Sequence, residues 1–217
     1  MKSLSLSKPH ILVMVGLPGS GKSFFARQFS DTFGAPLVSY DKIRHTLFET
    51  PQYNKDEIIL VKNIAEYQEN ELLKTQKTFI VDGGADQKIE RSELRKRAQK
   101  AGYDVLLIWV QTDENTAKYR SMKRSRRQTY DQLNQSLTDE QYSQLVKRFT
   151  APTVNENSIV ISGKHTYAAQ ARVVLKKLVA PREAAPSRQV VSRETRLPQA
   201  GESDRDNTPH RRNVLIR

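Results

Sequence analysis

The stretch Gly16-Leu17-Pro18-Gly19-Ser20-Gly21-Lys22-Ser23 decides the fold, because it fits the pattern G-x-x-x-x-G-K-[ST]. Glycines let such a loop curl until its backbone N–H groups point at phosphate oxygens, and the helix that follows adds the positive end of its dipole. Lys22 would bring a charge to the β- and γ-phosphates, and the Ser23 hydroxyl could ligate Mg²⁺. The whole loop is therefore predicted to bind a nucleoside triphosphate. No guanine-reading N-K-x-D pattern is present, which favours ATP.

The flanks of this loop supply the strand and the helix that the motif requires. Residues 10–15 form a continuous apolar run typical of a buried parallel strand, and apolar residues recur with helical spacing over 22–33. Further strands are predicted over 36–39, 78–82, 103–110 and 158–161. Further helices are predicted over 41–48, 55–75, 87–101, from Thr112 or Asp113 onward, from 138 to about 149, and over 165–179. This alternation predicts an α/β fold, a five-stranded parallel sheet with helices on both faces.

Charge and composition divide the chain. Of its 217 residues 37% are hydrophobic, and the net charge of +12 favours anionic partners without choosing among them. Residues 1–9 are expected to be an extension and residues 10–180 one P-loop domain. Residues 181–217 are poor in apolar side chains and are predicted to be a disordered basic tail. This tail holds 8 Lys and Arg against 5 Asp and Glu, so it contributes +3 and the rest of the chain +9.

The chain contains no cysteine, which excludes disulfides, cysteine-ligated zinc and a cysteine nucleophile. Its first apolar run, 11–15, is too short for a signal-peptide core or a membrane span. We therefore expect a cytoplasmic protein without a membrane partner.

Asp82 ends a predicted strand of the same sheet as the phosphate loop. A carboxylate at this position suits the acidic partner that holds Mg²⁺, directly or through water. The alternative is a turn residue, because Asp before Gly83-Gly84 is common in turns. We favour the metal role for Asp82, together with Ser23.

Four features of residues 10–180 resemble the AAA-domain-like P-loop kinases related to polynucleotide 5′-kinases and zeta-toxin-like sugar-nucleotide kinases. They are the phosphate loop, the segment Ser39-Tyr40-Asp41-Lys42-Ile43-Arg44, the pair Val81-Asp82 followed by Arg91, and an Arg-rich stretch followed by Phe149-Thr150-Ala151-Pro152. The resemblance implies a nucleoside-kinase-like fold. One departure is that many relatives carry a polar Thr-Asn pair where this chain has Gly83-Gly84-Ala85.

The resemblance also implies roles for two residues after the second strand. The residue matching Asp41 takes the proton of the acceptor hydroxyl, and a carboxylate at the carboxyl end of a neighbouring strand is well placed for this. Arg44, one helical turn on, could bind a substrate anion bidentately. The alternative reading has Asp41 as a helix N-cap, which is compatible with catalysis, and Arg44 as an exposed helix residue.

Residues 118–127 resemble the family's lid, which brings arginine to the transferring phosphoryl group. Helical spacing puts Arg120, Arg124 and Arg127 on one face, and Arg120 and Arg124 are the preferred catalytic candidates. The alternative is a solvated basic helix or a nucleic-acid patch. Arg91 matches a position that often contacts substrate in the family, against the alternative of a plain surface arginine.

Two functions follow as expectations. The first is an ATP- and Mg²⁺-dependent kinase that moves the γ-phosphate to a hydroxyl, with Lys22, Asp41, Arg120 and Arg124 as catalytic groups. A polynucleotide 5′-hydroxyl fits the basic charge, and a small metabolite or sugar nucleotide fits the family equally well. The second is a nucleotide-dependent RNA-binding module or regulatory ATPase without a kinase acceptor.

Overall fold

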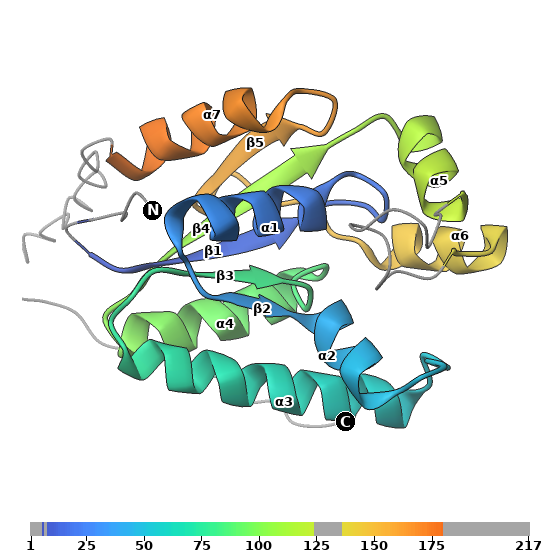
Figure 1. Cartoon of the computed structure of the whole chain (residues 1–217), viewed down its shortest axis with the longest axis horizontal. Coiled ribbons are helices and arrows are strands. Elements are labelled where there is room, and N and C mark those ends of the chain that lie inside the picture. The colour runs from blue at the N-terminus through green and yellow to red at the C-terminus, as the bar shows by residue number, and fades with distance from the viewer. Residues whose placement is uncertain (1–5, 7, 124–135, 180–217) are drawn as a thin grey trace, which may run out of the picture. The chain divides into compact units, whose positions relative to one another are not determined.

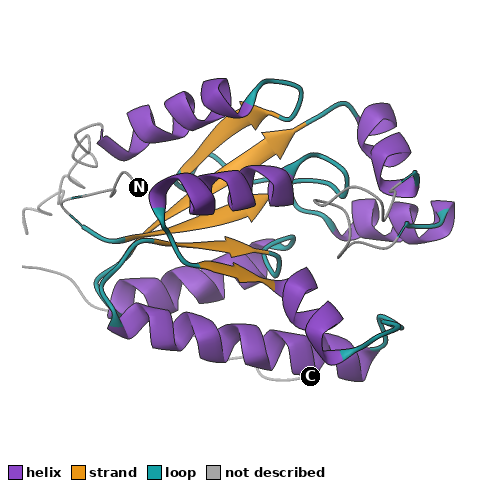
Figure 2. Cartoon of the chain, in the orientation of Figure 1, coloured by secondary structure: helices purple, strands orange, loops and turns teal. Residues whose placement is uncertain are grey.

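The computed structural model describes residues 6, 8–123 and 136–179 and has the predicted α/β architecture (Figure 1). Its strands are all parallel, as the arrows in Figure 2 show, and lie in the order β2-β3-β1-β4-β5. The strands are β1 His10–Val15, β2 Leu37–Ser39, β3 Phe79–Asp82, β4 Asp104–Gln111 and β5 Ser158–Ser162. The helices are α1 Lys22–Phe33, α2 Tyr40–Leu47, α3 Lys55–Lys74, α4 Lys88–Lys100, α5 Glu114–Met122, α6 Asp139–Arg148 and α7 Tyr167–Val179.

Alternate residues of the central strands face two helical layers. On one face, Leu12 and Met14 of β1 pack with α1 and α7, for example with Phe29 and Val174. On the other face, Ile11, Val13 and Val15 pack with α3 and α4, through side chains that include Leu73, Leu94 and Ala98. Figure 1 shows α5 and α6 beyond the carboxyl ends of the strands. Burial on both faces explains why β1 is apolar from Ile11 to Val15.

The ends of the helices have recognisable causes. Gly34 ends α1 in the left-handed conformation that glycine adopts without strain. The alternative in which Asp41 caps α2 is wrong: the Ser39 side chain accepts from the Lys42 N–H, and Asp41 lies in the first turn. Asp113, rather than Thr112, caps α5, with its side chain accepting from the Thr116 N–H. Because Ser39 carries the cap, the Asp41 carboxylate is free for another role.

Strand register brings the site residues to one edge of the sheet. Asp82, the last residue of β3, pairs with Ser39 of β2 on one side and with Met14 of β1 on the other. Asp41 follows shortly after the end of β2, and the phosphate loop follows directly after β1. The residues that follow these strands therefore meet around Asp82, at the carboxyl edge where open parallel sheets bind ligands.

The predicted extension and tail fall largely outside the described residues. Residues 1–180 and 181–217 separate as two units, and the described part of the first runs through β1 to α7. The disordered state expected for the tail stays a prediction. Among the described helices, none is both long and apolar enough to cross a membrane.

Candidate functional site

The phosphate loop joins β1 to α1 and is curled tightly. The Ser20 N–H donates to the Leu17 carbonyl at 3.1 Å, and the Thr112 hydroxyl of the β4–α5 turn donates to the Ser20 carbonyl at 3.0 Å. Gly163, just after β5, packs so closely on the Ser20 carbonyl that a Cβ would collide with it. The ends of β4 and β5 thus hold the loop in shape from outside.

Two features of the loop fit phosphate binding. Lys22 lies in the first turn of α1 with its Nζ inside the curl, donating to the carbonyls of Gly16 at 2.6 Å and Leu17 at 3.0 Å. Gly19 has φ +78°, and a Cβ there would strike the Ala117 carbonyl of α5. The loop therefore needs glycine both for its backbone angle and for the close approach of α5.

Asp82 forms the acidic centre of the site. Its side chain is buried, and the Ser23 hydroxyl donates to its carboxylate. Burial raises the pKa of Asp82, the Ser23 hydrogen bond opposes that rise, and the nearby Asp41 carboxylate adds to it. Lys22 also lies close enough to lower the pKa of Asp82. The structure thus brings together the four predicted residues Lys22, Ser23, Asp41 and Asp82.

The residues at this centre fit Mg²⁺. Ser23 and Asp82 present adjacent oxygen ligands, and the mutual repulsion of Asp82 and Asp41 would be relieved by a cation. Within the described part of the chain no group of three or more His, Cys, Asp or Glu could cage a metal. Such a sparse ligand set suits Mg²⁺, which is usually held by one or two carboxylates together with substrate phosphates.

Arg44 is buried rather than exposed, so the alternative of a surface arginine is wrong. Its Nη1 lies 3.6 Å from Glu57, and its guanidinium carbon lies 4.5 Å from the centre of the Tyr53 ring. Its Nε and Nη1 have no hydrogen-bond partner among the described residues. Unused donors on a buried cation are costly, so Arg44 retains capacity for an anion near Asp41.

Arg91 is also buried, contrary to the alternative of a plain surface arginine. Its Nε and Nη2 bond the two carboxylate oxygens of Glu156 at 2.7 and 3.1 Å. Its Nη1 donates to the carbonyls of Ala85 at 3.2 Å and Thr150 at 2.8 Å. The guanidinium therefore joins the turn after β3 to the segment before β5. A substrate-binding role for Arg91 stays a prediction that this arrangement does not favour.

Of the three arginines predicted to lie on one face of the lid, the described residues include Arg120. Arg120 of α5 donates from Nη1 to the Gly163 carbonyl at 3.2 Å, which places it beside the phosphate loop. Arg124 and Arg127 lie outside the described residues. Helix α5 is seated on the loop through Ala117 and is joined to α6 by an ion pair between Lys118 and Asp139.

Sequence reasoning missed Tyr40, whose ring fills the space beside the turn after β3. A Cβ added to Gly84, which has φ +63°, would collide with the Tyr40 ring. This packing accounts for the glycines that replace the family's polar pair.

The Tyr40 hydroxyl lies 3.4 Å from Glu69 Oε1, and Arg97 Nη2 lies 2.7 Å from Glu69 Oε2. The pKa of Tyr40 is raised by burial and by the charge of Glu69. The one signal for this contact in the sequence is that Tyr40, an aromatic residue, directly precedes Asp41.

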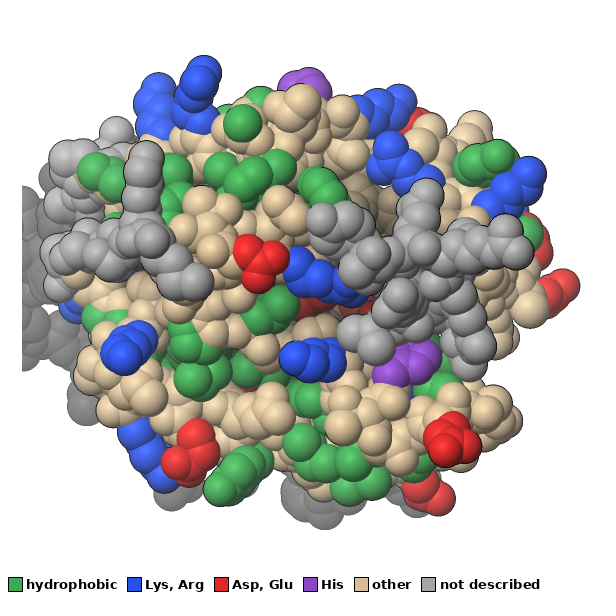
Figure 3. Space-filling model, in the orientation of Figure 1, with side chains coloured by type: hydrophobic (Ala, Val, Ile, Leu, Met, Phe, Trp, Pro, Cys, Tyr) green, Lys and Arg blue, Asp and Glu red, His purple; other side chains and the backbone are tan. Residues whose placement is uncertain are grey.

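The Lys and Arg side chains that the structure describes do not form one patch on the face shown in Figure 3. Lys and Arg side chains are spread around that face, with Asp and Glu side chains between them. Among the side chains described on this face, charge alone therefore does not outline a nucleic-acid surface.

The fold and the site define a P-loop nucleotide-binding protein of the kinase-like type. A family model described as "AAA domain" matches residues 11–152, so the chain belongs to this family. No curated protein sequence matches the chain.

Solved structures share this fold at low sequence identity. APS kinase CysC of Mycobacterium tuberculosis, in complex with AMPPNP and APS, is 17% identical with a TM-score of 0.57, over 80% of this chain and 99% of that one. Kti12 of Chaetomium thermophilum, in complex with ADP-AlF3, is 18% identical with a TM-score of 0.59, over 78% and 100%. A chain of the Pnkp1/Rnl/Hen1 RNA repair complex is 22% identical with a TM-score of 0.54, over 66% and 45%. Together they establish the P-loop kinase fold.

Proposed function

We propose that the protein is an ATP-dependent phosphotransferase that moves the γ-phosphate of ATP to a hydroxyl acceptor. The observation that carries this proposal is the proximity of Asp41 to the Asp82–Ser23 pair at the ends of neighbouring strands. Two carboxylates beside a phosphate loop allow a division of work, in which one takes part in metal binding and the other acts as a base.

The roles of the residues follow from their positions. Loop N–H groups and Lys22 hold the phosphates, and Ser23 and Asp82 would hold Mg²⁺, which neutralises charge on the β- and γ-oxygens when bound. The oxygen of the acceptor hydroxyl bonds to the γ-phosphorus while the bond between the γ-phosphorus and ADP breaks. Asp41 accepts the proton that this hydroxyl loses. Arg120 stabilises charge on the transferring group, and the same role for Arg124 rests on the sequence alone.

Arg44 would bind an anionic group of the acceptor. Its Nε and Nη1, which have no hydrogen-bond partner among the described residues, belong to a side chain one helical turn from Asp41, where such a group would orient the reacting hydroxyl. Glu57 and Tyr53 hold the guanidinium and limit how far it must move.

The test is transfer of labelled γ-phosphate to a panel of 5′-hydroxyl oligonucleotides, nucleosides and sugars. Asp41→Asn should reduce transfer about 10²- to 10⁴-fold, the usual worth of a general base, while ATP still binds. Asp56→Asn, which removes an exposed carboxylate in the first turn of α3, is the control and should leave transfer unchanged. Full turnover in Asp41→Asn would show that Asp41 is not the base.

A second candidate is a nucleotide-dependent RNA-binding or regulatory ATPase. The likeness to Kti12, which is not described as a kinase, and the charge of +12 favour it. It predicts that water is the sole acceptor in the panel and that added RNA changes the rate of ATP hydrolysis.

A further inference from the structure

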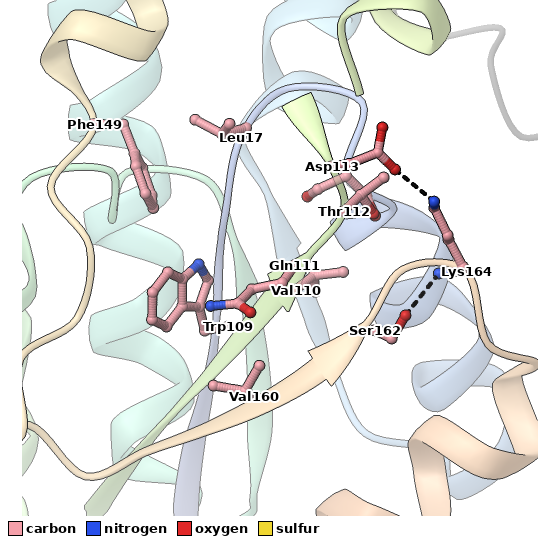
Figure 4. Close-up of a pocket in the computed structure, with 11 residues that line it drawn as sticks. Leu17, Trp109, Val110, Gln111, Thr112, Asp113, Phe149, Val160, Ser162 and Lys164 are labelled. Carbon is pink, nitrogen blue, oxygen red and sulfur yellow. Dashed lines mark hydrogen bonds and ion pairs between the residues drawn. The ribbon is translucent and has the colours of Figure 1, made fainter. Parts of the chain in front are cut away.

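A pocket of about 570 Å³ opens beside the phosphate loop, at the carboxyl ends of β4 and β5 (Figure 4). This volume lies in the range of sites for small ligands. Its lining includes the apolar side chains of Leu17, Trp109, Phe149 and Val160.

The pocket lies on the sheet face opposite α1 and α7. Trp109 and Val160 are register partners on adjacent strands, and Trp109 packs at the border of the core that α3 and α4 cover. Val160 is 48% exposed, so the sheet is open at this point. Val160, the Trp109 indole and the Phe149 ring thus form apolar walls around an open space at this edge of the sheet.

The shape and chemistry of the lining favour a flat aromatic ligand. In Figure 4 the Phe149 ring points toward the Trp109 indole from the opposite side of the pocket, and Leu17 lies beside the space between them. Gln111 places its carboxamide next to the indole, where it could bond the edge of a heterocycle. Aromatic walls stack on the face of any nucleobase.

The pocket is connected to the proposed reaction site. Leu17 belongs to both, because it is a residue of the phosphate loop. The Thr150 N–H donates to the Asp86 carbonyl at 2.9 Å, which joins the segment carrying Phe149 to the turn that follows Asp82. Leu17 and the segment that carries Phe149 therefore border both the pocket and the residues around the proposed reaction site.

We propose that this pocket, defined by Leu17, Trp109, Phe149 and Val160, binds a nucleobase of the phosphate acceptor. The proposal rests on the proposed kinase function and narrows its acceptor to a nucleoside or a 5′-hydroxyl oligonucleotide. The net charge of +12 suits the phosphates of an oligonucleotide acceptor.

Trp109 makes the proposal directly measurable, because it is the only tryptophan in the sequence. The full chain, saturated with AMPPNP, is titrated with a short 5′-hydroxyl oligothymidylate while tryptophan fluorescence is recorded. A stacked base should quench Trp109 saturably. An abasic oligonucleotide of the same length, which keeps the phosphates and lacks the bases, should not. Equal responses to the two, or none to either, would overturn the proposal.

Variants separate stacking from simple packing. Phe149→Leu keeps apolar volume and loses the aromatic face, and Phe149→Tyr keeps the face. The oligonucleotide Kd should rise about tenfold in Phe149→Leu and stay near wild type in Phe149→Tyr. Val160→Gln, at an exposed strand position, should also weaken binding, whereas Val154→Gln should not, because Val154 is fully exposed outside the pocket. Unchanged affinity in both Phe149→Leu and Val160→Gln contradicts the proposal.

The pocket and the kinase function fail in different ways. Quenching of Trp109 by an oligonucleotide or nucleoside, without phosphate transfer, would support base binding in the pocket and contradict the proposed kinase function. Phosphate transfer to sugars, without quenching of Trp109 by any base, would support the kinase function and contradict base binding in the pocket. Quenching by AMPPNP alone that Val160→Gln abolishes would assign the pocket to the base of ATP and overturn an acceptor site. Comparing nucleoside with oligonucleotide in the same titration distinguishes the two acceptor sources.

Discussion

At Asp82, burial and function act in opposite directions. Burial raises the pKa of this carboxyl, the Ser23 hydroxyl lowers it, and the neighbouring Asp41 raises it further. A buried carboxylate with a raised pKa costs stability in the free protein whenever it is ionised. The same charge is what a divalent cation needs, so we interpret Asp82 as a residue kept for binding rather than for folding.

Asp82→Asn should therefore stabilise the nucleotide-free protein near neutral pH by about 1 kcal/mol. The pKa of Asp82 is higher in the folded state than in the unfolded state, so the cost of its charge is largest above both values. It fades as the pH falls toward the ordinary carboxyl pKa of about 4. Urea unfolding at neutral and acidic pH measures this difference.

The same variant should lose the Mg²⁺-dependent part of ATP affinity, measured by calorimetry with and without the metal. Asp56→Asn serves again as the exposed control and should change neither quantity. A less stable Asp82→Asn at neutral pH would mean that the charge of Asp82 is compensated in the folded protein.

At the scale of elements, Arg91 acts as a clamp between α4, the turn after β3 and the segment that enters β5. Burial raises the pKa of Glu156, but the hydrogen bonds and charge of Arg91, with help from Thr153, bring it below its ordinary value. Because the clamp holds both ends of the irregular segment 149–157, it also positions Phe149 at the pocket.

Arg91→Leu should lower the free energy of unfolding by about 3 kcal/mol at neutral pH, because it leaves Glu156 partly buried without its cationic partner. The folded-state pKa of Glu156 is depressed, so the ion pair contributes above the unfolded value, and its contribution is lost as the pH falls through the folded value. Wild type and variant should therefore converge in acid. Urea unfolding across pH provides the measurement.

Arg95→Leu is the matched control on the same helix. The Arg95 side chain is exposed and makes a single long contact, 3.5 Å from Nη1 to the Asn155 carbonyl, so we expect a change within about 0.5 kcal/mol. Equal losses in the two variants would show that the clamp adds nothing beyond general surface charge.

At the scale of the whole molecule, residues 1–180 hold the described core and most of the positive charge. The two hydrophobic layers around β1 involve residues between Ile11 and Leu178. The tail, 181–217, contributes +3 of the net charge of +12. Folding stability and the charge around the site should therefore depend little on the tail.

Deleting residues 181–217 should change the melting temperature by no more than about 2 °C and leave ATP affinity unchanged. Differential scanning calorimetry of the full and shortened chains checks both, with ATP added to one set of samples. A large fall in melting temperature would show that the tail packs on the domain.

The sequence by itself determined the parts of this protein that depend on local order. The run from His10 to Val15, the loop up to Ser23 and the alternation of strands with helices predicted the sheet and the nucleotide site, because period and glycine placement are local properties. Asp82 could be predicted because it ends a strand of the same sheet, whereas the structure shows that this strand lies next to the one that leads into the loop.

Only the tertiary structure decided which side chains are occupied and which are available. The sequence marks both Arg91 and Arg44 as candidate substrate-binding residues. In the structure the Arg91 guanidinium is hydrogen-bonded to Glu156 and to backbone carbonyls, whereas Nε and Nη1 of Arg44 have no hydrogen-bond partner among the described residues. The pocket at Trp109 likewise forms between segments far apart in the chain. Burial and non-local contacts set these differences, and no pattern within one segment carries them.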